Sequence, residues 1–175
     1  TDFEGSGVAP DSLSFKIRMD MSKSSLREYT FNHLLLNAGT SERSIINLDT
    51  FWLSFTGYEQ DSASNLKKEF RDKISVQGKL NLRNLKNPKY DLLVLLKNES
   101  MSKILGARTA LDNLDAELTL KGEGFEPDSI IADINCSLQN WKYLGRTMNP
   151  QTFTIKLNRE SSGYKSLELN SDIAN

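Results

Sequence analysis

The stretch Leu13-Ser-Phe-Lys-Ile-Arg-Met-Asp-Met21 decides the fold class, because its apolar and polar residues alternate without a break. Successive side chains of a β-strand point to opposite faces of a sheet, so a period of two specifies a strand with one apolar and one polar face. The apolar face of this strand would consist of Leu13, Phe15, Ile17, Met19 and Met21.

The same alternation recurs along the chain, and turn sequences such as Asn87-Pro88 and Asn149-Pro150 separate the runs. Two further segments, Ile45–Phe55 and Tyr90–Leu96, are more continuously apolar and could be strands covered on both faces. The alternating runs predict that these residues share the apolar faces: Ile74, Val76, Leu80, Leu82, Leu114, Ala116, Leu118, Leu120, Ile130, Ala132, Ile134, Cys136, Leu138, Phe153, Ile155, Leu157, Leu167 and Leu169.

Helical patterns are scarce. The best case is Ser62–Asp72, where Asp61 or Ser62 can cap the first turn and Leu66 and Phe70 form an apolar pair four residues apart. A weaker helical pattern covers Glu99–Leu105. We therefore expect an all-β chain with one short helix near residues 62–72.

The composition excludes several functional classes. The chain has 175 residues, 22 Lys and Arg against 23 Asp and Glu, one Cys and one His. This charge balance lacks the basic footprint of nucleic-acid binders, and one Cys rules out an internal disulfide or a multi-cysteine zinc site. No apolar run approaches the roughly 20 residues of a membrane-spanning helix. We expect no membrane span, no nucleic-acid partner, no metal and no cofactor.

The residues that could carry catalysis have simpler explanations. The pair Gly5-Ser-Gly7 leads through Pro10-Asp11-Ser12 into an alternating strand, whereas a dinucleotide-binding loop needs a helix there. His33 lies in a predicted strand without a Gly-x-Ser-x-Gly nucleophile motif elsewhere in the chain. Cys136 falls on an apolar strand face, where it is a small buried hydrophobe. We predict that the chain is not an enzyme.

A repeat with a spacing of 117 residues links the two ends of the chain. Gly5-Ser-Gly7 followed by Pro10-Asp11-Ser12 matches Gly122-Glu-Gly124 followed by Pro127-Asp128-Ser129, and Ile17, Thr30 and Asn32 match Ile134, Thr147 and Asn149. We expect related units to begin near residues 1–56 and 118–175, joined by a β and helical segment, 57–117. The initial Thr1 and the alternating run at Leu167–Leu169 favour a single fragment, 1–175, of a longer repetitive protein.

The apolar strand faces allow two architectures. Two sheets can pack face to face in a closed sandwich, or one curved sheet can leave its apolar face open as a trough. Few residues remain that could form a covering layer, which favours the trough.

Several of these motifs together resemble the TamB-like branch of the AsmA-like superfamily, in the form common in Bacteroidetes-type bacteria. The resemblance rests on Leu114–Gly124, on Pro127-Asp-Ser-Ile130 with the alternating strand after it, and on Leu167-Glu-Leu169-Asn-Ser171-Asp172. The N-terminal copy departs from the pattern, with Leu48-Asp49-Thr50-Phe51 where Ser-Asp is expected.

The resemblance implies a long curved sheet of antiparallel or mixed strands, folded into a U-shaped groove known as a β-taco. It also implies a periplasmic location, a parent chain anchored in the inner membrane, and an Omp85-type outer-membrane partner of the TamA kind that contacts other parts of that chain. Such a groove is thought to carry phospholipid between the two membranes and to support outer-membrane protein assembly. The family implies no catalytic residues.

Two other functions remain open. The chain could be a structural or adhesive β-sandwich module, or it could be a scaffold that offers strand edges to outer-membrane proteins by β-augmentation.

Overall fold

The computed structural model describes residues 1–7, 14–26, 29–42, 44–60, 67–98, 111–125, 130–159 and 165–172, and these residues form an all-β structure. The strands are β1 (Asp2–Ser6), β2 (Ser14–Leu26), β3 (Tyr29–Glu42), β4 (Ile45–Gln60), β5 (Lys67–Asn81), β6 (Lys89–Asn98), β7 (Leu111–Asp112), β8 (Leu114–Glu123), β9 (Ile131–Gln139), β10 (Lys142–Tyr143), β11 (Arg146–Thr147), β12 (Gln151–Arg159) and β13 (Lys165–Ser171).

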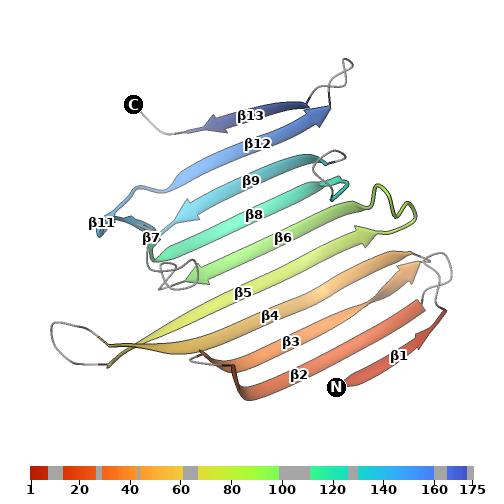
Figure 1. Cartoon of the computed structure of the whole chain (residues 1–175), viewed down its shortest axis with the longest axis horizontal. Helices are drawn as coiled ribbons and strands as arrows, with labels where there is room; N and C mark the ends of the chain where they lie inside the picture. Colours follow the sequence, from red (N-terminus) through yellow and green to blue (C-terminus); the bar gives the residue numbers. More distant parts are fainter. Residues whose placement is uncertain are drawn as a thin grey trace.

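Ten strands form one antiparallel sheet in which spatial order follows chain order, β1-β2-β3-β4-β5-β6-β8-β9-β12-β13 (Figure 1). Each strand pairs with the one before it, and the two outermost strands, β1 and β13, form the edges of the sheet. This arrangement follows from the sequence, because alternating strands joined by turn residues pair locally as hairpins.

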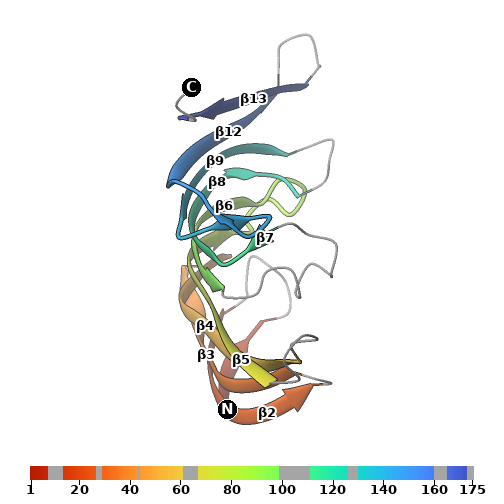
Figure 2. The same cartoon turned by 90° about the vertical axis from the view of Figure 1, so that its left-hand side faces the viewer.

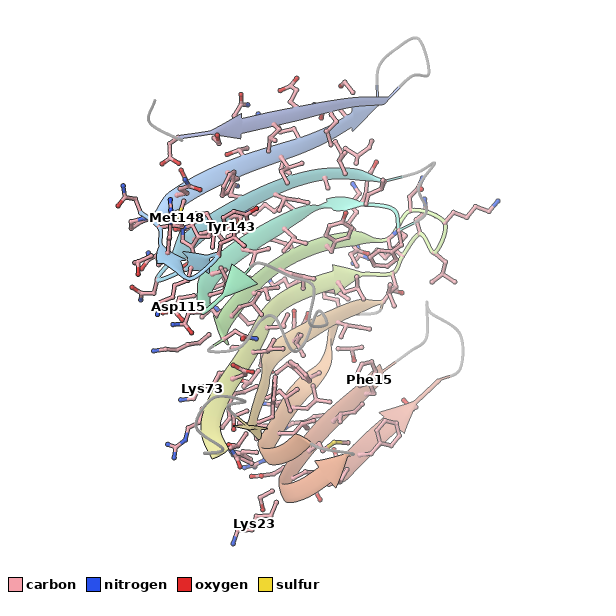
Figure 3. All side chains as sticks on the ribbon, turned by 60° about the vertical axis from the view of Figure 1, so that its left-hand side comes forward. Phe15, Lys23, Lys73, Asp115, Tyr143 and Met148 are labelled. Carbon is pink, nitrogen blue, oxygen red and sulfur yellow. The ribbon has the colours of Figure 1, made fainter. Side chains whose placement is uncertain are left out.

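Viewed from the side, the sheet is curved rather than flat (Figure 2). The strand registers place Phe15 and Lys73, both labelled in Figure 3, on opposite faces of the sheet. Register shifts at Phe31/His33 and at Leu48/Phe51 contribute to the bend, because a β-bulge kinks and twists its strand.

A small sheet of order β11-β10-β7 projects from one end of the main sheet, where Figure 3 labels Tyr143 and Met148. The N–H of Lys142 donates to the carbonyl of Asn113 at 3.3 Å, which joins β10 to the start of β8. The left-handed residues Asn113 (φ 43°) and Asn140 (φ 48°) allow the chain to turn from the main sheet into the small one.

The sequence repeat is also a repeat of strand register. Phe3 pairs with Ile17 in β1–β2, and Leu120 pairs with Ile134 in β8–β9, which is the same pair displaced by 117 residues. In the next hairpin, Met19 with Leu36 corresponds to Cys136 with Phe153. The correspondence extends to the hairpin tip, because Leu26–Tyr29 in β2–β3 matches Tyr143–Arg146 in β10–β11.

Backbone conformation repeats as well. Gly7 (φ 82°) and Gly124 (φ 77°) both lie in the left-handed region at a strand end, and Lys23 (φ 54°) matches Asn140 (φ 48°). The correspondence ends at the next strand. Leu36 pairs with Phe51, but Phe153 pairs with Ser171 rather than with Glu168.

The expected helix is wrong. Residues 67–72 of the predicted segment Ser62–Asp72 belong to β5, which pairs with β4 from Gln60↔Lys67 to Ile45↔Asn81. Long-range pairing over fifteen residues outweighs the weak local preference for a helix. Residues 62–66 and the weaker helical candidate, Glu99–Leu105, lie outside the described residues.

Candidate functional site

The candidate site is the apolar face of the ten-stranded sheet, built from rows of side chains that cross the strands. One row consists of Ile17, Ala38, Leu48, Gly78, Leu92, Leu120, Ile134, Ile155 and Leu169, in which neighbours are cross-strand partners. A second row consists of Met19, Leu36, Phe51, Val76, Val94, Leu118, Cys136 and Phe153. At about 4.8 Å between strands, the apolar rows extend roughly 40 Å across the sheet.

The strand registers place the sequence-predicted apolar residues that the structure describes on this one face. Leu82 follows β5, and its N–H donates to the carbonyl of Ser44 at 2.7 Å, which continues the β4–β5 pairing. Leu114 opens β8, opposite Asn98, and Ile130 immediately precedes β9. Leu13 lies outside the described residues.

Three strands contribute residues that the sequence prediction missed. β3, β4 and β6 add Leu34, Leu36, Ala38, Ile46, Leu48, Phe51, Leu53, Leu92, Val94 and Leu96. Apolar residues on the opposite face, such as Trp52 and Leu95, hid the alternation in these runs. Leu95 is 41% exposed, so the interpretation of Tyr90–Leu96 as a strand covered on both faces is wrong at this position.

Most side chains of the apolar face are only half-buried. Phe15, Ile17, Val94 and Ile155 are of intermediate exposure, whereas Phe55, Tyr90, Leu114 and Ala132 are buried. At the edges, Phe3 and Leu167 are each 67% exposed. In a two-layer protein such side chains would be buried against a second layer. Among the described residues no second large sheet covers this face.

A stacked pair of aromatic rings lies at the start of β6. The Tyr90 ring stacks on Phe125 with ring centroids 5.5 Å apart and an interplanar angle of 8°. It also lies against Gly122, where an added Cβ would come within 2.9 Å of Tyr90 Cζ. Burial raises the pKa of the Tyr90 phenol. Burial also raises the pKa of the Cys136 thiol, which favours a neutral packing residue over a nucleophile.

The opposite face of the sheet is polar. Lys121 Nζ lies 3.2 Å from Asp91 Oδ2, and both side chains are exposed. His33 Nε2 lies 2.8 Å from Asp20 Oδ1, and its ring meets Trp52 edge-on at 5.0 Å. A shallow depression of about 300 Å³ on this face is lined by residues that include Lys73, Lys97, Leu95 and Glu117. The exposed Lys121–Asp91 ion pair contributes little stability.

The described residues meet neither the requirements of a metal site nor those of a membrane-spanning helix. Within the described ranges, no three His, Cys, Asp or Glu side chains come together in a way that could hold a metal ion. In the same ranges, no helix has the length and apolar character needed to cross a membrane. The sequence-predicted residues that the structure brings together are apolar, and His33 is not among them, because it lies on the polar face.

Comparison with known proteins adds no relative. No family model matches the chain, and neither does any curated protein or any solved structure.

Proposed function

We propose that the apolar face binds the acyl chains of lipids, or an apolar polypeptide segment, and that the chain acts as a segment of a TamB-like conduit in the periplasm. The observation that carries this proposal is the set of apolar rows across as many as nine of the ten strands, which the described residues leave without a second layer.

Physical chemistry supports an apolar ligand. Moving a methylene group from water to an apolar surface contributes about 0.8 kcal/mol, so a half-exposed face of this length can bind several acyl chains. The outer face, with its Lys, Asp and Glu residues, stays in water. No single residue is indispensable for such binding.

The resemblance to TamB-like proteins supplies the rest of the proposal. In that setting the ligand is phospholipid in transit between the inner and outer membranes, the parent chain is anchored in the inner membrane, and an Omp85-type partner of the TamA kind engages other parts of it. No catalytic step is involved.

The direct test is to purify the chain without detergent and to identify bound lipid by native mass spectrometry. Co-purified phospholipid, together with saturable binding of a fluorescent fatty acid, is the expected result. A chain that carries no lipid and binds no fatty acid would contradict the proposal.

Ile134→Asp provides the matching variant test, because Ile134 lies mid-row between Leu120 and Ile155. A carboxylate there would face hydrocarbon, which is costly, so we expect at least a tenfold loss of fatty-acid affinity. Asn135→Asp adds the same charge on the exposed outer face and serves as the control. In the full-length parent, Ile17→Asp and Ile134→Asp should abolish transport. Equal binding by the Ile134→Asp and Asn135→Asp chains, at equal secondary structure by circular dichroism, would rule out this face.

The adhesive-sandwich alternative needs a second sheet packed on the apolar face, and the described residues place none there. The alternative of strand pairing at the sheet edges is favoured by the outer edge of β1, which has no neighbouring strand among the described residues.

A further inference from the structure

The outer edge of β1 lacks a neighbouring strand among the described residues. β1 pairs with β2 along its inner edge, from Asp2↔Arg18 to Ser6↔Ser14. Phe3 is 67% exposed, whereas its counterpart 117 residues later, Leu120, is of intermediate exposure in the middle of the sheet. The large exposed fraction of Phe3 therefore reflects the lack of a neighbouring strand on the outer edge of β1, not the residue type.

The repeat shows what kind of strand fits this edge. β1 and β8 make the same registers with the strands that follow them, and β8 is paired on its other edge by β6. In that pairing Leu120 lies opposite Leu92 and Gly122 lies opposite Tyr90. The equivalent residues of β1 are Phe3 and Gly5.

The backbone N–H and C=O groups on the outer edge of β1 are positioned for the same pairing that β8 makes with β6. The N–H of Gly124 donates to the carbonyl of Pro88 at 2.9 Å. In an antiparallel ladder the hydrogen-bonded pairs recur every second residue, so Gly122–Tyr90 and Leu120–Leu92 also exchange backbone bonds. By the same register, Phe3 and Gly5 direct their N–H and C=O groups to the open edge of β1.

Because Gly5 has no side chain, it leaves space on β1 for an aromatic ring from a neighbouring strand. At Gly122 an added Cβ would lie 2.2 Å from the carbonyl oxygen of Ile131 and 2.7 Å from the hydroxyl oxygen of Tyr90, whose ring lies over the glycine. At Gly5 an added Cβ would lie 3.0 Å from Cζ of Phe3, whose own ring lies over the glycine. An incoming aromatic residue would displace that ring, and the exposed Phe3 is free to move.

On the polar face of the sheet, the edge strand β1 favours a particular charge on a strand that pairs with it. In β8 the residue that faces Asp91 of β6 is Lys121, and their charged atoms lie 3.2 Å apart. The residue of β1 at the equivalent position is Glu4. A strand that pairs with β1 in this register therefore needs a basic residue where β6 has Asp91.

We propose that the open edge of β1 binds an antiparallel strand of the β6 type, in which the run Tyr90-Asp91-Leu92 is replaced by an aromatic, a basic and a leucine-like residue. The aromatic ring covers Gly5, the basic side chain meets Glu4, and the aliphatic side chain packs on Phe3. The apolar rows of the sheet continue onto the added strand. This inference does not rest on lipid binding.

The test uses fluorescent ten-residue peptides and the whole chain. One peptide has the β6 sequence Lys89–Asn98, and the other carries Asp91→Lys. In fluorescence anisotropy, the Asp91→Lys peptide should bind about two- to fivefold more tightly than the unchanged β6 peptide. This is the gain in affinity expected from one favourable cross-strand charge pair. The Glu4→Gln chain, in which the exposed carboxylate is removed, should bind both peptides equally.

Methylation of backbone nitrogens in the peptide distinguishes strand pairing from nonspecific hydrophobic binding. N-methylation at Leu92 removes a donor that faces β1 and should abolish binding, whereas N-methylation at Leu93 alters the opposite edge and should leave affinity unchanged. The proposal is overturned if neither peptide binds, if the two methylated peptides bind alike, or if the preference for Asp91→Lys survives in the Glu4→Gln chain.

Discussion

Gly78 is a residue of the apolar face at which the structure leaves no room for a side chain. It lies in the row between Leu48 and Leu92, with φ at +144°, and an added Cβ would come within 2.1 Å of the carbonyl oxygen of Asp91. Because the obstructing atom is backbone, the strands must separate. We expect Gly78→Ala to lower the free energy of unfolding by about 2–4 kcal/mol, combining overpacking with backbone strain.

Chemical denaturation would measure this change, with Gly145→Ala as the control. Gly145 also has a positive φ, +74°, but nothing lies within 4 Å of an added Cβ. Its substitution should cost only the conformational strain, about 1–2 kcal/mol. A smaller loss at Gly78 than at Gly145 would show that β5 and β6 are farther apart than the structure places them.

The carboxylate of Asp172 couples the last strand to pH. Hydrogen bonds from Thr152, from its hydroxyl and from its backbone N–H at 2.6 Å, hold the pKa of the Asp172 carboxyl below its ordinary value. A lowered pKa in the folded state means that the stabilisation is complete above the ordinary carboxyl pKa and is lost as pH falls through the folded value. We expect Thr152→Val to raise this pKa in a carboxyl NMR titration.

The neighbouring Thr154 provides the matched control for that titration. Its hydroxyl donates to Asn135 Oδ1 at 3.1 Å on the same polar face. Thr154→Val should therefore leave the pKa of Asp172 unchanged. If both variants shift the pKa equally, the effect comes from general changes in the β12–β13 pairing rather than from the Thr152 hydrogen bonds.

At the scale of strands, sequence and structure agree where one face is apolar and the other polar. The pattern in β2, β8, β9 and β12 predicted both the strand and the face of each residue. It gave the wrong result for residues 67–72 of β5, where Leu66 and Phe70 suggested a helix, although the alternating run from Ile74 correctly predicted the rest of that strand. The residues that decide β5 are its partners on β4 and β6, which are distant in sequence, and a local pattern contains no information about them.

The edge strand β13 should show alternating protection of its amides in hydrogen exchange. The N–H of Asp172 donates to the carbonyl of Thr152 at 3.2 Å, so the residues of the same parity, Asn170 and Glu168, also bond to β12. Leu167 and Leu169 point their N–H groups outward. We expect exchange at Leu167 and Leu169 to be at least tenfold faster than at Glu168 and Asn170, measured residue by residue by NMR.

Strand β12 supplies the comparison, because β9 and β13 pair with its two edges. Adjacent amides such as Ile155 and Lys156 should both exchange slowly. Equal rates at Leu167 and Glu168 would mean that the outer edge of β13 is covered, or that β13 does not pair in this register.

At the scale of the whole molecule, the sequence predicted that the site is an apolar sheet face, but it did not predict how far that face extends across the strands. The alternation identified apolar faces, and the scarcity of covering segments favoured an open one. What the sequence could not supply was the register that aligns Ile17 with Leu169 through seven intervening strands, because each hairpin fixes its own register through its turn. Long apolar runs in β4 and β6 concealed which half of their residues belongs to the face.

A face of this extent predicts how ligand affinity depends on chain length. If fatty acids lie along the apolar rows, each added methylene group removes further apolar surface from water, up to about 0.8 kcal/mol or fourfold in affinity. We expect affinity to rise two- to fourfold per methylene from ten to sixteen carbons, measured by displacement of a fluorescent fatty acid from the whole chain. Ile134→Asp should flatten this dependence, and Asn135→Asp should not. An affinity that does not depend on chain length would place the binding energy in the carboxylate head group, and thus on the polar face. The dependence on chain length is the deciding measurement because an apolar face without a specific pocket can discriminate between fatty acids only by the length of hydrocarbon that it covers.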